Sequence, residues 1–327
     1  MNAGSDLKEG IKTMKKERKV NGNNKTLKKR IRRFMPMYFM ALPGLLYLFI
    51  NNYMPLPGLV LAFKKFNAKK GIFGSDFIGL KNFEPLFKTK DAFVITRNTI
   101  LYNLAFIVIN TILAVFVAIM LAEMTSKLKK TYQCLILLPF MISMVIVSYL
   151  VFGFFSNDNG FVNNTLLKAL GKEPIQWYME KKYWPFIIVF VNAWKVTGYN
   201  CIIYLSAILG IDRGIYESAA IDGCSKWRQI SKITIPLLKP TIIMMTLLAI
   251  GRIFYSDFGL FYQVPMNQGA LFKVTNTIDT YVYRGLVQDG NYGISSAAGL
   301  YQSLVGFILI LAANLSVKKI EPESALF

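Results

Sequence analysis

Long apolar runs alternate with shorter polar segments along this chain, and the apolar runs dominate. Six of them are each long enough to cross the roughly 30 Å of hydrocarbon in a bilayer as one helix. They cover about 37–63, 98–123, 131–155, 184–210, 236–262 and 297–317. The pattern predicts an all-α integral membrane protein with about six transmembrane helices. Pro43, Pro55 and Pro57 predict that the first of these helices is kinked or broken near its outer end.

The polar segments suggest where the chain divides. A basic arm, 1–33, precedes the first transmembrane helix and an outer loop, 34–93. The remaining spans and loops form a core transmembrane domain, 94–318, followed by a short tail, 319–327. The outer loops of the core contain aromatic, Gly and Pro residues and are long enough to fold against each other or against a partner.

Composition supports a membrane location. Of the 327 residues, 54% are hydrophobic and the net charge is +20. Twelve of the 38 Lys and Arg residues precede position 34. Such an arm could bind nucleic acid, but directly before an apolar span it fits anionic lipid head groups better. We therefore expect a membrane-lipid partner and no nucleic acid.

The positive-inside rule gives an orientation. The arm, the loops 124–130 and 211–235 and the tail all carry Lys or Arg, and with six spans they lie on one side. That side is predicted to be the cytoplasm of a bacterium, so both termini are cytoplasmic in a plasma-membrane protein. The outer loop 64–97 is also basic, which weakens the rule for this chain.

The sequence lacks the residues that several kinds of chemistry require. The chain has no histidine, which is the usual general base and the commonest metal ligand. Its three cysteines, Cys134, Cys201 and Cys224, are isolated, and a buried cysteine acts as a small hydrophobic residue. No G-x-x-x-x-G-K-[ST] cradle for phosphates occurs. We expect neither a metal site nor an enzyme, and no cofactor bound by this chain.

The polar segment 212–235 predicts a compact pair of helices. Asp212 is a good N-cap for a helix at about 213–221, and Gly223 allows a turn with positive φ. Ser225 can cap a second helix at about 226–234, whose face carries Trp227, Ile230 and Ile233. Pro236 is expected to break that helix and to begin the fifth span. An ordinary amphipathic loop lying on the membrane has a similar composition.

The residues of this segment resemble the EAA loop of the permease subunits of bacterial ABC importers. That loop has the pattern E-A-A-x-x-D-G followed by I-x-L-P, and here Glu217, Ala219, Asp222, Gly223 and Pro236 match it. Ser218 stands where the second letter is usually Ala, and Ile235 stands where Leu is usual. The resemblance implies that this loop receives force from an ATPase. The expected coupling residues are Glu217, Ser218, Ala219, Asp222, Gly223, Trp227 and Pro236.

The likeness extends over nearly the whole chain after the arm. Segments beginning at Leu42, Phe77, Trp194 and Ile278 are similar to permeases of the carbohydrate uptake family, in the branch that takes up alginate- and pectin-derived oligosaccharides. The resemblance implies a type I importer permease fold, with the coupling loop at 212–236. It also implies a second homologous permease, two ATPase subunits that carry ATP and Mg²⁺, and an extracellular solute-binding protein that delivers an oligosaccharide.

Polar residues predicted at membrane depth are candidates for the substrate path, because burying them there is costly. Aromatic faces beside hydrogen-bonding groups suit sugars, and two cations with one acid would suit a uronate-bearing sugar. A role in helix packing or in the aromatic belt is the alternative for each residue. We expect Asn103, Asn110 and Asn314 to hydrogen-bond between helices. The path candidates are Lys195, Tyr199, Asn200, Tyr204, Arg252, Tyr255 and Asp257, with Arg252 and Tyr255 on one helix face.

Two other classes of protein stay open from the residues alone. An ion-coupled secondary transporter would need acidic residues in mid-span, and Asp257 is the only candidate besides Glu123 at a span end. A non-catalytic membrane scaffold would leave the EAA-like loop without an explanation.

Overall fold

The computed structural model describes residues 33–125, 128–288, 290–320 and 325. The predicted basic arm therefore lies outside the described residues except for Arg33, and so does most of the tail. The chain forms two compact units, Met1–Leu59 and Val60–Phe327. Within the described residues, five helices are long and apolar enough to span a membrane, and a bent pair of helices makes up to six.

The described part of the first unit is a helix that runs on to Phe63 and changes its form near its outer end, as the prolines predict. Residues 33–48 are α-helical, Phe49–Tyr53 form a π-helical turn, η1, and Leu56–Phe63 form a 3₁₀ helix, η2. Proline cannot donate a backbone hydrogen bond, which explains the change at Pro55 and Pro57. Pro43 lies inside the regular helix, so only the outer break is observed.

The second unit begins with a small hairpin. Strands β1, Lys64–Lys65, and β2, Asp76–Phe77, are antiparallel, and the short helix α2, Gly71–Gly74, lies between them. Lys70 pairs with Asp76 at 2.7 Å and lowers the pKa of that carboxyl group. Helices η3, Lys81–Phe83, and α3, Pro85–Lys88, lead into the first long helix of this unit.

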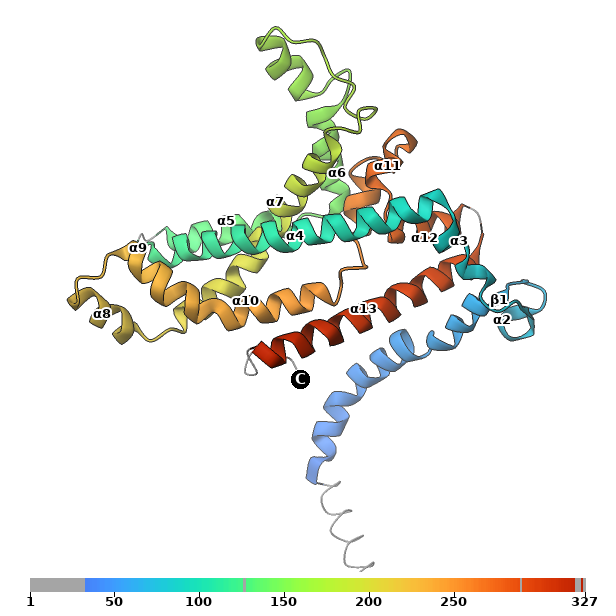
Figure 1. Ribbon diagram of the computed structural model, residues 1–327, viewed down its shortest axis with the longest axis horizontal. Helices are drawn as coiled ribbons and strands as arrows, with labels where there is room; N and C mark the ends of the chain where they lie inside the picture. The colour runs from blue at the N-terminus through green and yellow to red at the C-terminus, as the bar shows by residue number, and fades with distance from the viewer. Residues whose placement is uncertain (1–32, 126–127, 289, 321–324, 326–327) are drawn as a thin grey trace, which may run out of the picture. The chain divides into compact units, whose positions relative to one another are not determined.

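Four long helices build the second unit (Figure 1): α4, Lys90–Glu123; α7, Trp184–Leu209; α10, Ile235–Ile250; and α13, Tyr292–Ile320. Small buried residues, Ala114 and Ala118 on α4 and Cys201 on α7, lie in the core that these two helices share with α10. Small side chains allow close helix approach in a membrane. Cys201 thus fits the predicted role of a small hydrophobic residue, whereas Cys134 is exposed.

The predicted third span is a broken helix rather than one continuous helix. It consists of α5, Lys129–Met141, and α6, Met144–Phe155, which are bent by 92° relative to each other. Ile142 has extended backbone angles, and the Ser143 hydroxyl accepts a hydrogen bond from the Ile146 N–H at 3.4 Å. Periodicity did not show the break, because the apolar residues continue across it.

The fifth span is also placed differently from the prediction, which put it at 236–262. Helices α9, Lys226–Gln229, η5, Ile230–Thr234, and α10 are continuous, and the helix ends at Ile250. Pro236 therefore does not break the helix. The π-helical turn η5, in which Ile235 N–H bonds to Ile230 O, directly precedes this proline. A π-helical turn is wider than an α-helical turn, and the helix continues through Pro236. Residues 251–257, called here the unwound segment, are turns and irregular backbone.

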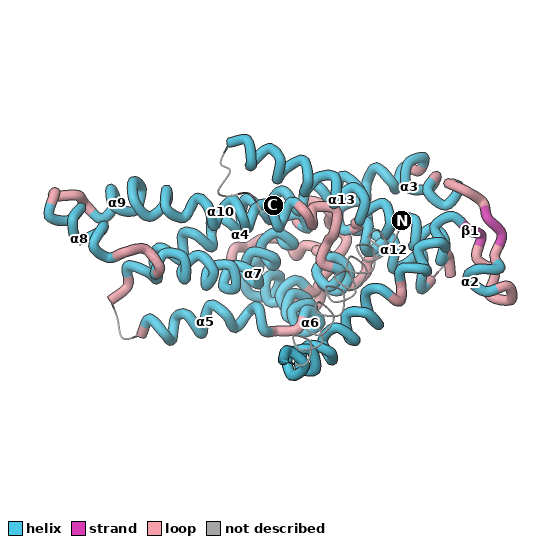
Figure 2. Tube along the Cα trace, turned by 90° about the horizontal axis from the view of Figure 1, so that it is seen from below, coloured by secondary structure: helices cyan, strands magenta, loops and turns pink. Residues whose placement is uncertain are grey.

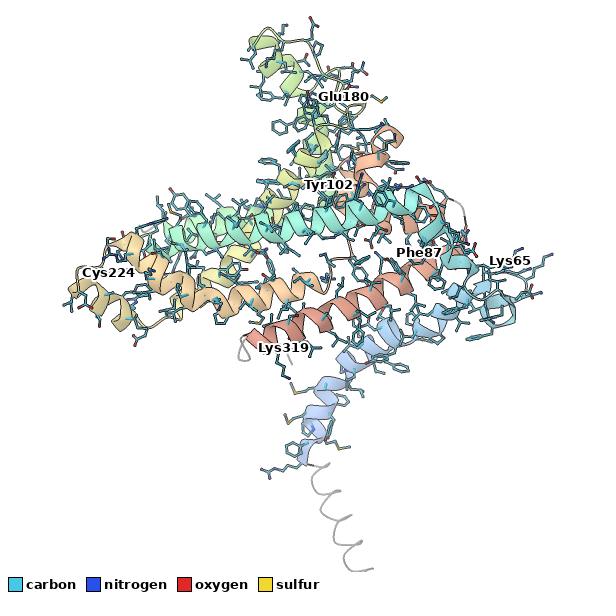
Figure 3. The ribbon with its side chains drawn as sticks, viewed as in Figure 1. Lys65, Phe87, Tyr102, Glu180, Cys224 and Lys319 are labelled. Carbon is cyan, nitrogen blue, oxygen red and sulfur yellow. The ribbon has the colours of Figure 1, made fainter. Side chains whose placement is uncertain are left out.

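The remaining elements of the second unit are short. They are η4, Val162–Leu167; η6, Gly259–Gln263; η7, Gly269–Leu271; α11, Phe272–Thr275; and α12, Ile278–Val287. The pair of strands lies at the opposite end from the helices α8, Arg213–Ile221, and α9 (Figure 2). Lys65 and Cys224 mark these two ends among the side chains (Figure 3).

Candidate functional site

The predicted helical hairpin at 212–235 is present, and its first helix has the predicted bounds. Helix α8 runs from Arg213 to Ile221, and the Asp212 carboxylate accepts a hydrogen bond from the Gly214 N–H at 3.0 Å. This satisfies one of the backbone donors that a helix leaves free at its start. The N-cap residue therefore fixes where the hairpin begins.

Gly223 ends α8 with the left-handed turn that its sequence position suggested. Its φ is +75°. Its N–H bonds to Ala220 O at 3.0 Å, and the next N–H, of Cys224, bonds to Ala219 O at 2.9 Å. These two bonds form a Schellman motif, in which a residue without a Cβ is strongly favoured at the left-handed position. The Asp-Gly pair of the EAA pattern thus has a direct geometric reason.

Three side-chain contacts hold the hairpin in shape. The Tyr216 and Thr234 hydroxyls lie 2.9 Å apart and join α8 to η5. The buried Gln229 amide donates to Cys224 O at 3.2 Å. Lys226 forms an ion pair of 3.0 Å with Glu123 at the end of α4. The sequence did not point to these contacts, since the six residues involved form no motif by spacing.

Most predicted coupling residues face away from the rest of the chain. Glu217, Ser218, Asp222 and Pro236 are exposed, while Ala219 is half-buried. Trp227 is 78% exposed, and Ile221 on α8 is 87% exposed. Large apolar side chains left uncovered on a polar loop indicate a protein partner.

One local prediction for the hairpin, the Ser225 cap, differs from the structure. Ser225 occupies the N-cap position of α9, but its side chain makes no capping hydrogen bond there. Asp222 bonds through its backbone N–H to Ser218 O at 3.0 Å. Its carboxylate accepts no hydrogen bond from any described residue, because it points outward on an exposed turn.

A polar cavity of about 590 Å³ lies between α4, α7, α10 and the unwound segment. This volume is in the range of sites that hold small molecules. Helix α4 contributes Asn103, Phe106, Ile107, Asn110 and Thr111, and α7 contributes Val196, Asn200 and Tyr204. Met245, Leu248 and Ala249 of α10 and Arg252, Tyr255, Ser256 and Asp257 of the unwound segment complete the lining.

The structure brings five of the predicted path residues together in this cavity. They are Asn200, Tyr204, Arg252, Tyr255 and Asp257. The predicted helix face shared by Arg252 and Tyr255 does not exist, because both lie beyond the end of α10. They reach the same cavity through the turns of the unwound segment instead.

Charge in the cavity comes from Arg252 and Asp257. The Asp257 carboxylate accepts a hydrogen bond from the Leu260 N–H at 3.1 Å. The Arg252 guanidinium is exposed and forms no hydrogen bond or ion pair with any other described residue. It is thus available to an anionic group entering the cavity.

Lys195 and Tyr199 lie outside the lining of this cavity. The Lys195 ammonium donates to Pro139 O at 3.3 Å, to Phe140 O at 3.2 Å and to Ile142 O. These carbonyls lie at the end of α5, where the third span is broken, and the Pro139 carbonyl also accepts the Ile142 N–H. Tyr199 stacks on Phe140, with ring centroids 4.6 Å apart. Both side chains therefore support the break between α5 and α6.

The interhelical hydrogen bond expected of Asn110 is confirmed, whereas Asn103 bonds to the unwound segment rather than to another helix. The Asn110 amide on α4 donates to the Asn192 side chain on α7 at 2.8 Å. The Asn103 amide donates to the backbone carbonyls of Ile253 and Tyr255 at 2.9 Å each. Both asparagines also line the cavity, and so does Ser256, which the sequence did not single out.

Comparison with known proteins agrees with this geometry. Residues 92–322 match the family described as binding-protein-dependent transport system inner membrane component. The chain belongs to this family. It is 33% identical over 289 residues to Protein LplB of Bacillus subtilis, an alignment that covers 88% of this chain and 90% of LplB. It is 32% identical to the polygalacturonan/rhamnogalacturonan transport system permease protein YteP of the same species, covering 88% and 89% of the two chains.

A solved structure shows the same fold. A chain in the crystal structure of a bacterial ABC transporter, involved in import of the acidic polysaccharide alginate, superimposes with a TM-score of 0.81 at 31% identity. The match covers 90% of this permease and 99% of that chain. The permease is therefore a multi-pass membrane protein with the type I importer fold, and the predicted resemblance is confirmed.

Proposed function

We propose that this permease is one of two related subunits that form the translocation path of an ATP-driven oligosaccharide importer. One observation carries the proposal. A polar, aromatic-lined cavity and an exposed hairpin with the EAA pattern occur in the same unit, joined by the continuous helix Lys226–Ile250. A movement imposed on α9 is thus transmitted directly to the helix that ends at the cavity.

The mechanism follows from that connection. Binding of ATP by two partner ATPase subunits moves the hairpin, and the long helices shift between two packed arrangements. One arrangement opens the cavity to the outside and the other opens it to the cytoplasm. The exposed Ile221 and Trp227 supply the apolar contact for the ATPase, and the hairpin side is accordingly the cytoplasmic side of a bacterial plasma membrane.

The remaining partners follow from the family. Its description names binding-protein dependence, so a solute-binding protein delivers the oligosaccharide at the end opposite the hairpin. One solved relative is an alginate transporter in complex with a periplasmic protein bound to an alginate pentasaccharide. The second permease is expected to complete the wall of the path.

The substrate class is an acidic oligosaccharide. Arg252 is a cation without a partner among the described residues, and the cavity also offers the amide of Asn200. Guanidinium groups bind carboxylates in pairs of parallel hydrogen bonds, whereas neutral sugars use the amides and hydroxyls. Two similar proteins are named for alginate and for polygalacturonan, which are both polyuronates.

The substitution Arg252→Gln tests this assignment. The permease, its partner permease, the ATPase and the binding protein are reconstituted in vesicles, and uptake of a galacturonate trisaccharide is compared with uptake of a neutral galactose trisaccharide. A hydrogen bond to a charged group is worth about 1.5–3 kcal/mol, so the variant should lose roughly 10- to 100-fold in preference for the acidic sugar.

The matched control is Asp257→Asn, which removes the opposite charge from the same cavity. It should leave or increase the preference for the acidic sugar, because it removes a repulsive carboxylate. Equal uptake of both sugars by the unmodified complex would reject the acidic class. Uptake that is selective for the acid and insensitive to Arg252→Gln would reject the role of Arg252.

A further inference from the structure

We infer that Asp279 is a positioning residue, which holds the unwound segment so that Arg252, Tyr255 and Asp257 face the substrate cavity. The inference rests on the proposed function of that cavity. It assigns a role to the sequence Ile278–Arg284, which resembles the carbohydrate permeases but lies outside the cavity lining.

The unwound segment needs support because irregular backbone inside a membrane protein must have its polar groups satisfied internally. Short turns use several of its N–H groups, for example Ile253 N–H to Ile250 O at 3.1 Å. Its carbonyls depend on side chains from other helices. Asn103 donates to Ile253 O and Tyr255 O, and Gln302 on α13 donates to Phe254 O at 2.7 Å.

Asp279 supplies the contact at the far end of the segment. One oxygen of its carboxylate accepts hydrogen bonds from Ser256 N–H at 2.6 Å and from Ser256 Oγ at 2.7 Å. The Ser256 hydroxyl also lies 2.7 Å from Thr277 Oγ1. Ser256 is thus held through its backbone and its side chain between the cavity residues Tyr255 and Asp257.

The start of helix α12 stabilises and positions the Asp279 carboxylate. Asp279 is in the first turn of α12, where the helix dipole favours a negative charge. Thr277 and Thr280 form a capping box at that helix start, and the Ile278 N–H bonds to Thr99 Oγ1 on α4 at 3.1 Å. The helix start is therefore fixed to α4 before it contacts Ser256.

Arg284 braces the other end of α12. Its guanidinium donates to Asn267 Oδ1 at 3.0 Å and to Asn276 Oδ1, and it lies 4.3 Å from the centre of the Phe272 ring. Burial lowers the pKa of this guanidinium, so these acceptors offset the cost of desolvation. The motif from Ile278 to Arg284 thus forms a rigid bracket, and its Asp279 supplies the hydrogen bonds to the unwound segment.

The experiment compares Asp279→Ala with Asp91→Ala in the reconstituted complex. Asp91 is a matched control because it also lies in the first turn of a helix, α4, but is exposed and its carboxylate forms no hydrogen bond or ion pair with a described residue. Loss of the two bonds to a charged acceptor should raise the apparent KM for the galacturonate trisaccharide about tenfold or more. The maximal uptake rate should change much less.

Amide hydrogen exchange gives a readout that needs no substrate. Peptides that cover 251–258 should exchange faster in Asp279→Ala than in Asp91→Ala, because Ser256 N–H loses its acceptor. Asp279→Asn keeps one acceptor oxygen and should lie between Asp279→Ala and the unmodified chain in both measurements. It also serves as the test if the alanine variant fails to fold.

Unchanged exchange at 251–258 in both Asp279 variants would overturn the inference, and so would an equal rise in KM for Asp91→Ala. A fall in maximal rate without a change in KM would overturn it as well. Failure of the proposed function looks different, since the unmodified complex would then not favour the acidic sugar while exchange at 251–258 could still respond to Asp279.

Discussion

At the scale of single residues, Lys195 shows how one charge can serve a backbone rather than a ligand. Its position within α7 made it a candidate for the substrate path. The structure instead places its ammonium on three carbonyls at the end of α5. A helix end leaves such carbonyls unpaired, and a cation there also interacts favourably with the helix dipole.

Replacing Lys195 by Met should therefore destabilise the fold. Hydrogen bonds to a charged group are worth about 1.5–3 kcal/mol, so their loss should lower the thermal midpoint of the purified complex by several degrees. Lys172→Met, at an exposed lysine of the outer loop, should leave the midpoint unchanged. An unaltered midpoint combined with a raised KM would instead return Lys195 to the substrate path.

At the scale of elements, the hairpin of α8 and α9 is the part of the molecule that its local sequence specifies best. Its first helix begins and ends at the predicted residues because Asp212 and Gly223 act through neighbouring backbone groups. The two broken spans are different. The end of α5 depends on Lys195, and the end of α10 depends on Asn103, Gln302 and Asp279.

The substitution Gly223→Val should uncouple the permease from its ATPase. A residue with a branched Cβ pays about 1–2 kcal/mol at a left-handed position, so the turn between α8 and α9 should distort. We expect loss of ATPase from the complex during affinity purification of the tagged permease.

Gly171→Val is the matched control for that substitution. Gly171 also has positive φ, at +62°, and a Cβ at either glycine meets no atom within 4 Å. It lies in the outer loop 156–183, and the variant should retain the ATPase. Equal retention of the ATPase by both variants would contradict the coupling role of the hairpin.

At the scale of the whole molecule, the source of energy distinguishes an ABC importer from an ion-coupled transporter. Asp257 lines the cavity and Glu123 is paired with Lys226 near the hairpin, so Asp257 is the acidic residue placed where an ion could accompany the sugar. Family membership and the EAA hairpin favour ATP instead.

Uptake into vesicles that contain ATP should continue at an unchanged rate when a protonophore removes the proton gradient. It should stop when ATP is replaced by a non-hydrolysable analogue, because no other driving force is present. Loss of uptake with the protonophore at constant ATP would instead support ion coupling through Asp257, and Asp257→Asn would then abolish it.

The sequence by itself determined the class of protein, the apolar spans, the bounds of α8 and the residues of the EAA pattern. These depend on features that act locally or repeat regularly, such as hydrophobic length, an N-cap and a glycine turn. Five of the predicted path residues line the cavity. They could be predicted because polar groups within apolar runs are costly and therefore mark functional positions.

Only the tertiary structure decided where the helices break and which polar residues support those breaks. Asp279 lies 23 positions after Ser256, and Lys195 lies 53 positions after Ile142. Partners this far apart in the sequence are not linked by any local pattern of residues. Apolar residues continue through the break between α5 and α6, which hides it from hydropathy. The position of Arg252 in the cavity depends on hydrogen bonds that side chains of α4, α12 and α13 form with the backbone of the unwound segment. Such long-range contacts appear only when the chain is folded.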